Sequence, residues 1–193
     1  MRLPKILCAL SVVASTALAA EPYTLLKPGD QPPPLRFKTL DGQSLTWADL
    51  KGQTVVLDFW ATWCPPCIKA IPHLNAWVDE FAGKPVRFVS ITYEKEDVVR
   101  PFLAKHPLRT VVGLDEGCSL FRSFKAWGIP MVVMVGADGK VKAVVHAEEL
   151  STALVRQVIE GETPKVTQAR PYKDPKGAEE YFCGAGAAKA SEP

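Results

Sequence analysis

The sequence predicts an α/β protein with a mixed central sheet flanked by helices. A nearly continuous apolar run, residues 54–60, is typical of a central strand covered on both faces, and an amphipathic helical pattern, residues 64–82, follows it. Residues 131–135 and 141–145 are apolar runs on either side of an Ala-Asp-Gly-Lys turn and predict an antiparallel hairpin. A strand–helix–strand start requires parallel pairing, so both kinds of pairing are expected.

A shorter hairpin is predicted ahead of the central strand. Residues 35–40 alternate apolar and polar side chains, an Asp-Gly turn follows, and residues 43–47 can pair back. Residues 21–34 are rich in proline and poor in large apolar groups, so we expect an extended lead-in.

The rest of the domain alternates between strand and helix patterns. We expect strands at 86–93 and 109–114, and helices at 96–105, 118–127 and 148–160. The domain then spans residues 35–161. The polar, proline-containing residues 162–193 are expected to form a C-terminal tail or a wrapping segment.

Residues 1–20 have the three-part pattern of a secretory signal peptide. Arg2 and Lys5 form a basic start, residues 6–19 are apolar or small, and Ala-Leu-Ala at 17–19 fits a cleavage site near residue 19 or 20. The apolar run is shorter than the ~20 residues of a spanning helix. We therefore expect export to the periplasm with cleavage, the alternative being an uncleaved anchor.

The composition excludes several classes of protein. The 193 residues include 23 basic and 21 acidic side chains, and removal of Arg2 and Lys5 leaves 21 against 21. A neutral chain gives no electrostatic reason to expect nucleic acid or an acidic membrane surface as partner. An apolar fraction of 47% excludes a wholly disordered chain.

A pair of cysteines opens the predicted helix at 64–82. Cys64 and Cys67 are three residues apart, close enough for a small-ring disulfide. Free N–H groups and the helix dipole stabilise an anion at the helix start, so Cys64 is the expected nucleophile. Cys67, one turn further, is expected to be more buried and to act as the resolving thiol.

Other uses of this spacing fit less well. Half a zinc site needs two more ligands, and haem attachment needs a His where Ile68 stands. A structural disulfide is unusual at this spacing, and a copper or zinc carrier would need nearby Met or His ligands. An intact motif also argues against a catalytically inert scaffold. We expect redox catalysis without a metal or cofactor.

The motifs resemble those of the thioredoxin superfamily. The sequence DFWATWCPPC at 58–67 is followed by Pro72 and later by Gly-Ile-Pro at 128–130. The export signal, the Ala-Thr before Trp63 and the early hairpin resemble the exported TlpA/ResA-like branch. The resemblance covers about residues 35–161. It implies a thioredoxin fold, here with an N-terminal hairpin extension and a C-terminal tail, and thiol-disulfide oxidoreductase activity.

The resemblance also implies roles for residues outside the pair. Ile129-Pro130 would be a cis peptide facing the cysteines and would offer the Ile129 backbone to an extended substrate. Trp63 would shape the substrate surface. Asp58, a carboxyl in an apolar strand, would have a raised pKa and take the proton of Cys67.

Two positions depart from the pattern of this branch. Some relatives carry Asn where Asp58 stands, and many carry Glu where Ala70 stands. An auxiliary acid is therefore missing, and Asp58 would act alone.

The residues between the cysteines indicate the direction of electron flow. Pro65 and Pro66 lack N–H groups, and no His or Lys stands there to stabilise a thiolate. A less stabilised reduced form means a more reducing couple, so we expect a protein disulfide reductase rather than an oxidase or isomerase. The resemblance implies a membrane thiol-transfer protein as electron donor, and oxidised exported proteins, with apocytochrome c as one candidate, as substrates.

Cys118 and Cys183 are the remaining cysteines of the mature chain. An even count invites a disulfide between them that pins the tail to the domain. An intermolecular bridge and an additional redox thiol remain as alternatives.

Overall fold

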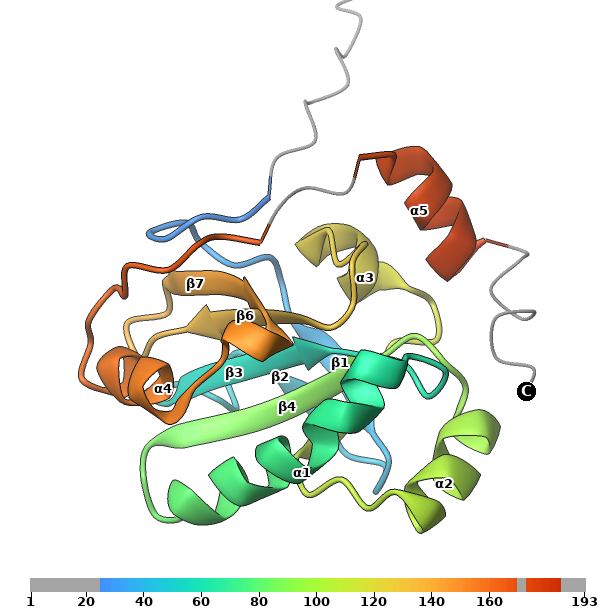
Figure 1. Cartoon of the computed structure of the whole chain (residues 1–193), viewed down its shortest axis with the longest axis horizontal. Helices are drawn as coiled ribbons and strands as arrows, with labels where there is room; N and C mark the ends of the chain where they lie inside the picture. Colours follow the sequence, from blue (N-terminus) through green and yellow to red (C-terminus); the bar gives the residue numbers. More distant parts are fainter. Residues whose placement is uncertain (1–24, 170–172, 185–193) are drawn as a thin grey trace, which may run out of the picture.

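A seven-stranded mixed sheet forms the centre of the protein in the computed structural model, which describes residues 25–169 and 173–184 (Figure 1). The expected signal peptide, residues 1–20, lies outside the described residues. The strand order is β2-β1-β5-β4-β3-β6-β7. The bounds are β1 Arg36–Thr39, β2 Ser44–Thr46, β3 Thr54–Phe59, β4 Val86–Thr92, β5 Val111–Leu114, β6 Met131–Val135 and β7 Val141–His146.

The pairing is parallel at the centre and antiparallel towards both edges. β3, β4 and β5 are parallel neighbours, whereas β6 pairs antiparallel with β3 and β7 antiparallel with β6. At the other edge β1 pairs antiparallel with both β2 and β5. The mixed sheet, the late hairpin and the N-terminal hairpin extension predicted from the sequence are therefore confirmed.

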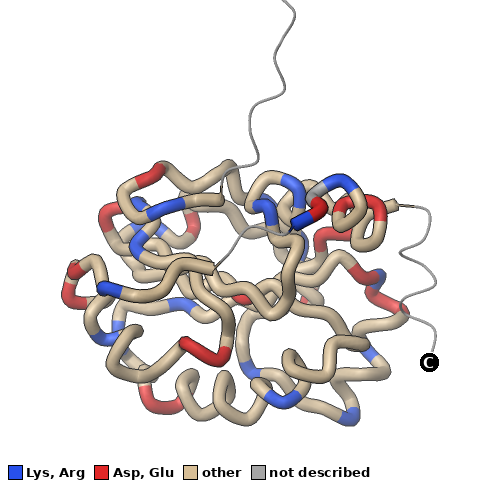
Figure 2. Tube along the Cα trace, turned by 45° about the horizontal axis from the view of Figure 1, so that its top comes forward, with Lys and Arg blue, Asp and Glu red and all other residues tan. Residues whose placement is uncertain are grey.

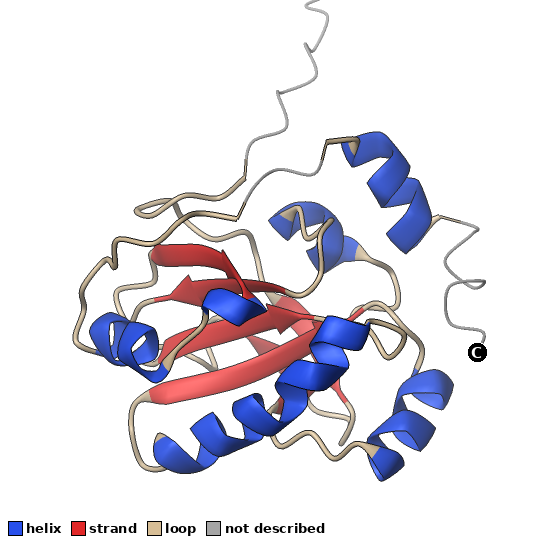
Figure 3. Ribbon diagram, viewed as in Figure 1, coloured by secondary structure: helices blue, strands red, loops and turns tan. Residues whose placement is uncertain are grey.

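Helices lie on both faces of this sheet (Figure 3). Their bounds are α1 Pro65–Glu80, α2 Glu96–Lys105, α3 Ser119–Phe124, α4 Thr152–Ile159 and α5 Pro175–Cys183, with a 3-10 turn at Ala147–Glu149. No helix in the described ranges is both long enough and apolar enough to cross a membrane. Acidic and basic residues are interspersed along the chain, as its balanced charge suggests (Figure 2).

The alternation of side chains along β3 divides the core in two. Val56 belongs to a cluster with Leu74 of α1 and Leu154 of α4. Leu57 points to the opposite face, where its cluster includes Phe121 of α3. α1 and α4 therefore cover one face and α3 the other. Burial on both faces explains why β3 reads as a continuous apolar run.

The C-terminal part differs from the prediction in two ways. The prediction of one helix at 148–160 is wrong, because Ser151 has an extended backbone and caps a new helix, α4, by accepting a hydrogen bond from the N–H of Leu154 at 3.3 Å. The tail contains a helix that the sequence pattern does not predict, α5. Asp174 caps α5 by accepting from the N–H of Gly177 at 3.0 Å, so a Pro- and Gly-containing segment still starts a helix.

The outer edge of β7 is partly paired with chain from both extensions of the domain. Near its start, Val141 donates to Asp30 O at 3.0 Å and accepts from Gly29 N–H at 2.8 Å. Further along, Val144 O accepts from Ala169 N–H at 2.8 Å. The lead-in and the segment after α4 therefore both lie against the same strand.

Candidate active site

The two cysteines of the motif lie at the start of α1 and form a disulfide. Cys64 is the residue before the helix, with an extended backbone, and Pro65 is the first helical residue. The Cα atoms of Cys64 and Cys67 are 5.2 Å apart. The N–H of Cys67 donates to Sγ of Cys64 at 3.3 Å. The helix start thus directs a main-chain N–H at the sulfur that is the expected nucleophile.

The expected difference in burial between the two cysteines is absent. The exposed fraction is 2% for Cys64 and 3% for Cys67. Trp63, the neighbour of Cys64, packs against two rings of α5, with centroid distances of 5.7 Å to Tyr181 and 6.0 Å to Phe182. The prediction failed because no pattern in the sequence indicates a tail helix on this side of the site.

Asp58 lies in the middle of β3 and is 4% exposed. It is two residues from Val56, so it points to the face that α1 covers. Ser90 of β4 donates to its carboxyl oxygen at 3.2 Å, and Thr110 donates to the Ser90 hydroxyl at 2.8 Å. Burial raises the pKa of Asp58 from 3.8 to about 7, and the Ser90 hydrogen bond lowers it in part. This carboxyl can take up or release a proton near neutral pH.

The peptide bond between Ile129 and Pro130 is cis. Met131, the next residue, pairs with Phe59 at the end of β3, and this places Pro130 beside the loop that leads to Cys64. Pro130 and Pro66 line the same cavity of about 400 Å³. The other residues lining this cavity come mainly from α1 and the turn after β7, and include His73, Trp77 and Leu150.

Two residues that the sequence reasoning missed hold the loop before Cys64. The Glu94 carboxylate accepts from the Thr62 N–H at 2.6 Å and from its hydroxyl at 2.7 Å, and Trp63 Nε1–H donates to the Tyr93 hydroxyl at 2.7 Å. Burial raises the pKa of Tyr93, so its hydroxyl stays neutral. The sequence did hold an indication of their position, because both residues directly follow β4. The carboxyl ends of the parallel strands β3 and β4 lie at the same edge of the sheet, so residues after β4 come close to the loop that follows β3.

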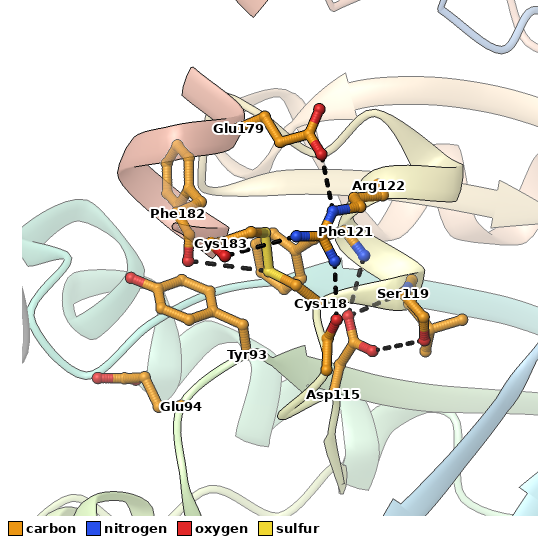
Figure 4. The surroundings of a disulfide bond; sticks show 12 residues. Tyr93, Glu94, Asp115, Cys118, Ser119, Phe121, Arg122, Glu179, Phe182 and Cys183 are labelled. Carbon is orange, nitrogen blue, oxygen red and sulfur yellow. Dashed lines mark hydrogen bonds and ion pairs between the residues drawn. A yellow bond between two sulfur atoms is a disulfide. The ribbon is translucent and has the colours of Figure 1, made fainter. Parts of the chain in front are cut away.

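The second cysteine pair is also joined. Cys118, just before α3, forms a disulfide with Cys183 of α5, across a Cα–Cα distance of 5.7 Å (Figure 4). Arg122 of α3 pairs with Glu179 of α5 at 2.7 Å. These contacts attach the tail helix to the α3 face.

Within the described ranges, no group of three or more His, Cys, Asp or Glu side chains is arranged to hold a metal ion. The start of α1 holds the two sulfur atoms of the Cys64–Cys67 disulfide, and the buried carboxyl of Asp58 lies on the face of the sheet that α1 covers.

Comparison with known proteins agrees with this chemistry. The Redoxin family matches residues 27–158. The thiol-disulfide oxidoreductase ResA of Bacillus anthracis is 28% identical over 140 residues, covering 72% of this chain and 78% of the relative. ResA of Bacillus subtilis (strain 168) is 27% identical over 141 residues, with the same coverage. A thiol:disulfide interchange protein of the thioredoxin family from Chlorobium tepidum TLS matches with a TM-score of 0.59 and 25% identity, covering 70% of this chain and 99% of the neighbour.

Proposed function

We propose that this chain, which belongs to the Redoxin family and is a ResA/TlpA-like thiol-disulfide oxidoreductase, works as a protein disulfide reductase. The observation that carries the direction is the hydrogen bonding of Cys64. Its sulfur accepts one main-chain N–H, from Cys67, while Pro65 and Pro66 contribute none. A thiolate with little stabilisation makes the dithiol a stronger electron donor.

The reaction proceeds through a mixed disulfide. The Cys64 thiolate attacks one sulfur of a substrate disulfide, and the other substrate sulfur leaves as a thiolate. Cys67 then loses its proton and attacks Sγ of Cys64, releasing the second substrate sulfur. Two electrons pass to the substrate, and the Cys64–Cys67 disulfide of the structure is the product.

Asp58 accepts the proton of Cys67 in this proposal. Its support is a pKa raised to about 7 by burial and its position on the face that α1 covers. A base is most effective when its pKa lies near the working pH.

Trp63, Ile129 and Pro130 are proposed to contact the substrate. Ile129 and Pro130 stand next to the end of β3, where an extended peptide can add its main chain to theirs.

We further propose that residues 1–20 direct export and are removed, that residues 35–161 form the catalytic domain, and that 162–193 are its tail. A reductase in the periplasm needs electrons, for which a membrane thiol-transfer protein is the proposed source. Oxidised exported proteins, with apocytochrome c among the candidates, are the proposed substrates.

The reduction potential tests the direction. We expect a value below roughly −200 mV on equilibration with glutathione or dithiothreitol, while a value near that of the strong periplasmic oxidant, roughly −120 mV, would contradict the proposal.

Trapping tests the roles of the two cysteines. Cys67→Ser should accumulate a mixed disulfide with an oxidised protein such as insulin, because the resolving thiol is missing. Cys64→Ser is the matched control and should trap nothing. Equal trapping by both variants would refute the assignment of Cys64 as the attacking residue.

A further inference from the structure

An aromatic pocket beside the reactive pair is filled by the tail of the chain. Phe182 of α5 is 5% exposed, although α5 lies at the end of the described chain. Its ring lies among four rings of the domain. The centroid distances are 5.9 Å to Tyr93, 6.0 Å to Trp63, 6.2 Å to Phe121 and 6.3 Å to Trp127.

This aromatic pocket adjoins the site of attack. Trp63 precedes Cys64 directly, and the Tyr93 hydroxyl fixes its indole. A protein substrate whose sulfur reaches Cys64 brings the side chains next to that sulfur against this wall. The pocket is therefore placed to select what stands beside a target cysteine.

The occupant has the chemistry of a substrate. Phe182 is the residue immediately before Cys183, and the sulfur of Cys183 is in a disulfide (Figure 4). The tail thus presents to the domain an aromatic side chain next to a disulfide cysteine.

We propose that the aromatic pocket is a docking site for an aromatic side chain beside the target disulfide of a protein substrate, which Phe182 occupies in cis while the Cys118–Cys183 disulfide holds α5 in place. The inference rests on the proposed role of Cys64 as the attacking cysteine. It does not depend on the direction of electron flow.

The disulfide is the principal tie between α5 and the domain. The Arg122–Glu179 pair is 44% and 48% exposed, and ion pairs of that exposure contribute little. A nine-residue helix is too short to persist without tertiary contacts. Once the bridge is open, the helix is held without a covalent bond, by packing of Phe182 and Ala178, the contact of Tyr181 with Trp63 and the exposed polar contacts of Arg122, and a substrate can compete for the pocket.

Opening the bridge requires an external dithiol, the chemical class that also reduces Cys64 and Cys67. Cys118 is 4% exposed and Cys183 is only partly buried, so the incoming thiolate attacks Sγ of Cys183. Sγ of Cys118 leaves as a thiolate and is protonated by water. The second thiol of the donor then resolves the mixed disulfide, leaving the donor as a disulfide and both Cys118 and Cys183 as thiols.

The test compares two peptides on a single reacting thiol. Both copy residues 179–183, one with Phe and the other with Ala before the cysteine, and each cysteine carries a thionitrobenzoate group whose release is coloured. The closed protein is Cys67→Ser in the chain from residue 21 onward, which lacks Cys8 together with the expected signal peptide, so Cys64 is the one free thiol beside the intact bridge. The open protein carries Cys118→Ser and Cys183→Ser in addition.

We expect the closed protein to react equally with both peptides, and the open protein to react at least about fivefold faster with the Phe peptide. Phe182→Ala in the closed background keeps the bridge, empties the pocket and should show the same preference. Glu179→Gln in that background is the matched control and should show none.

Equal rates with both peptides in the open protein and in Phe182→Ala would overturn the docking site. A preference already present in the closed protein would overturn control by the disulfide. Reaction with the small reagent dithionitrobenzoate reports on Cys64 alone. Loss of that reaction in Cys67→Ser would instead count against the proposed function.

Discussion

Replacement of Asp58 by Asn should remove a loss of stability that the wild-type protein suffers as pH rises. The carboxyl is 4% exposed within β3, and burial raises its pKa from 3.8 to about 7. In the unfolded chain the carboxyl is in water, and its pKa has its ordinary value. The folded protein therefore holds this proton more tightly than the unfolded chain does.

The direction and the size of the change in unfolding free energy with pH follow from this difference in pKa. Because the folded-state pKa is the higher one, the stabilising contribution of the neutral carboxyl is complete below pH 3.8 and is lost as pH rises through about 7. A tenfold change in an equilibrium is worth about 1.4 kcal/mol, so the rise in pKa corresponds to about 4 kcal/mol in the free energy of unfolding. Asn, which stays neutral, escapes this loss.

The assay is urea unfolding of the oxidised protein, followed by tryptophan fluorescence from about pH 4 to about pH 8. The difference in unfolding free energy between Asp58→Asn and wild type should move by about 4 kcal/mol in favour of the variant over this range, since other titrations cancel in the difference.

Asp138→Asn provides a control whose difference from wild type should stay nearly constant from about pH 4 to about pH 8. The hydrogen bond from Lys142 lowers the pKa of Asp138, so its contribution is present above pH 3.8 and is lost as pH falls. If the difference for Asp58→Asn stays constant with pH, or moves towards wild type as pH rises, the carboxyl is not held neutral by burial and the reasoning is refuted.

Three further variants test the packing around the site. Gly113→Ala should destabilise the protein by about 1–3 kcal/mol in urea unfolding, because a methyl at this position of β5 would lie 2.5 Å from side-chain atoms of Ile91 and Phe37. An unchanged urea midpoint would show that these side chains move aside without cost. Ser151→Ala should cost about 1 kcal/mol by removing the cap of α4, and thermal unfolding would show no shift if the cap contributes nothing. Glu94→Gln should cost about 1–3 kcal/mol, because the Thr62 N–H and hydroxyl donate to different oxygens of the carboxylate and an amide offers only one oxygen. Equal stability would mean that the loop before Cys64 is held by other contacts.

The central part of the fold was predictable because local patterns and tertiary contacts agree there. β3 is apolar on both faces and is covered on both, and residues 96–105 form α2 although Pro101 lies inside it. The pair Cys64 and Cys67 was found from its spacing and its position at the start of a predicted helix. By contrast, residues 148–160 carry a helical apolar pattern, but the Ser151 hydroxyl competes for a main-chain N–H and begins a separate helix.

Contacts between distant residues account for what the sequence did not reveal. The segment that forms α5 contains Pro175 and Gly177, residue types typical of turns, and Phe182 is buried because four rings from other parts of the chain surround it. The same helix packs against Trp63, the neighbour of Cys64, and Cys64 is as buried as Cys67. Glu94 was overlooked because its role depends on Thr62, thirty-two residues earlier in the chain.

The pairing of both chain extensions with β7 has a consequence for behaviour in solution. A free edge strand offers unpaired N–H and C=O groups on which another chain can build, and this is a common route to aggregation. Here Val141 and Val144 direct main-chain groups at residues 29–30 and 169 of the same molecule. The lead-in and the tail therefore cover part of the edge of the sheet within one molecule. A chain shortened to the strands and helices of the domain would expose main-chain groups of β7 with which another chain could pair.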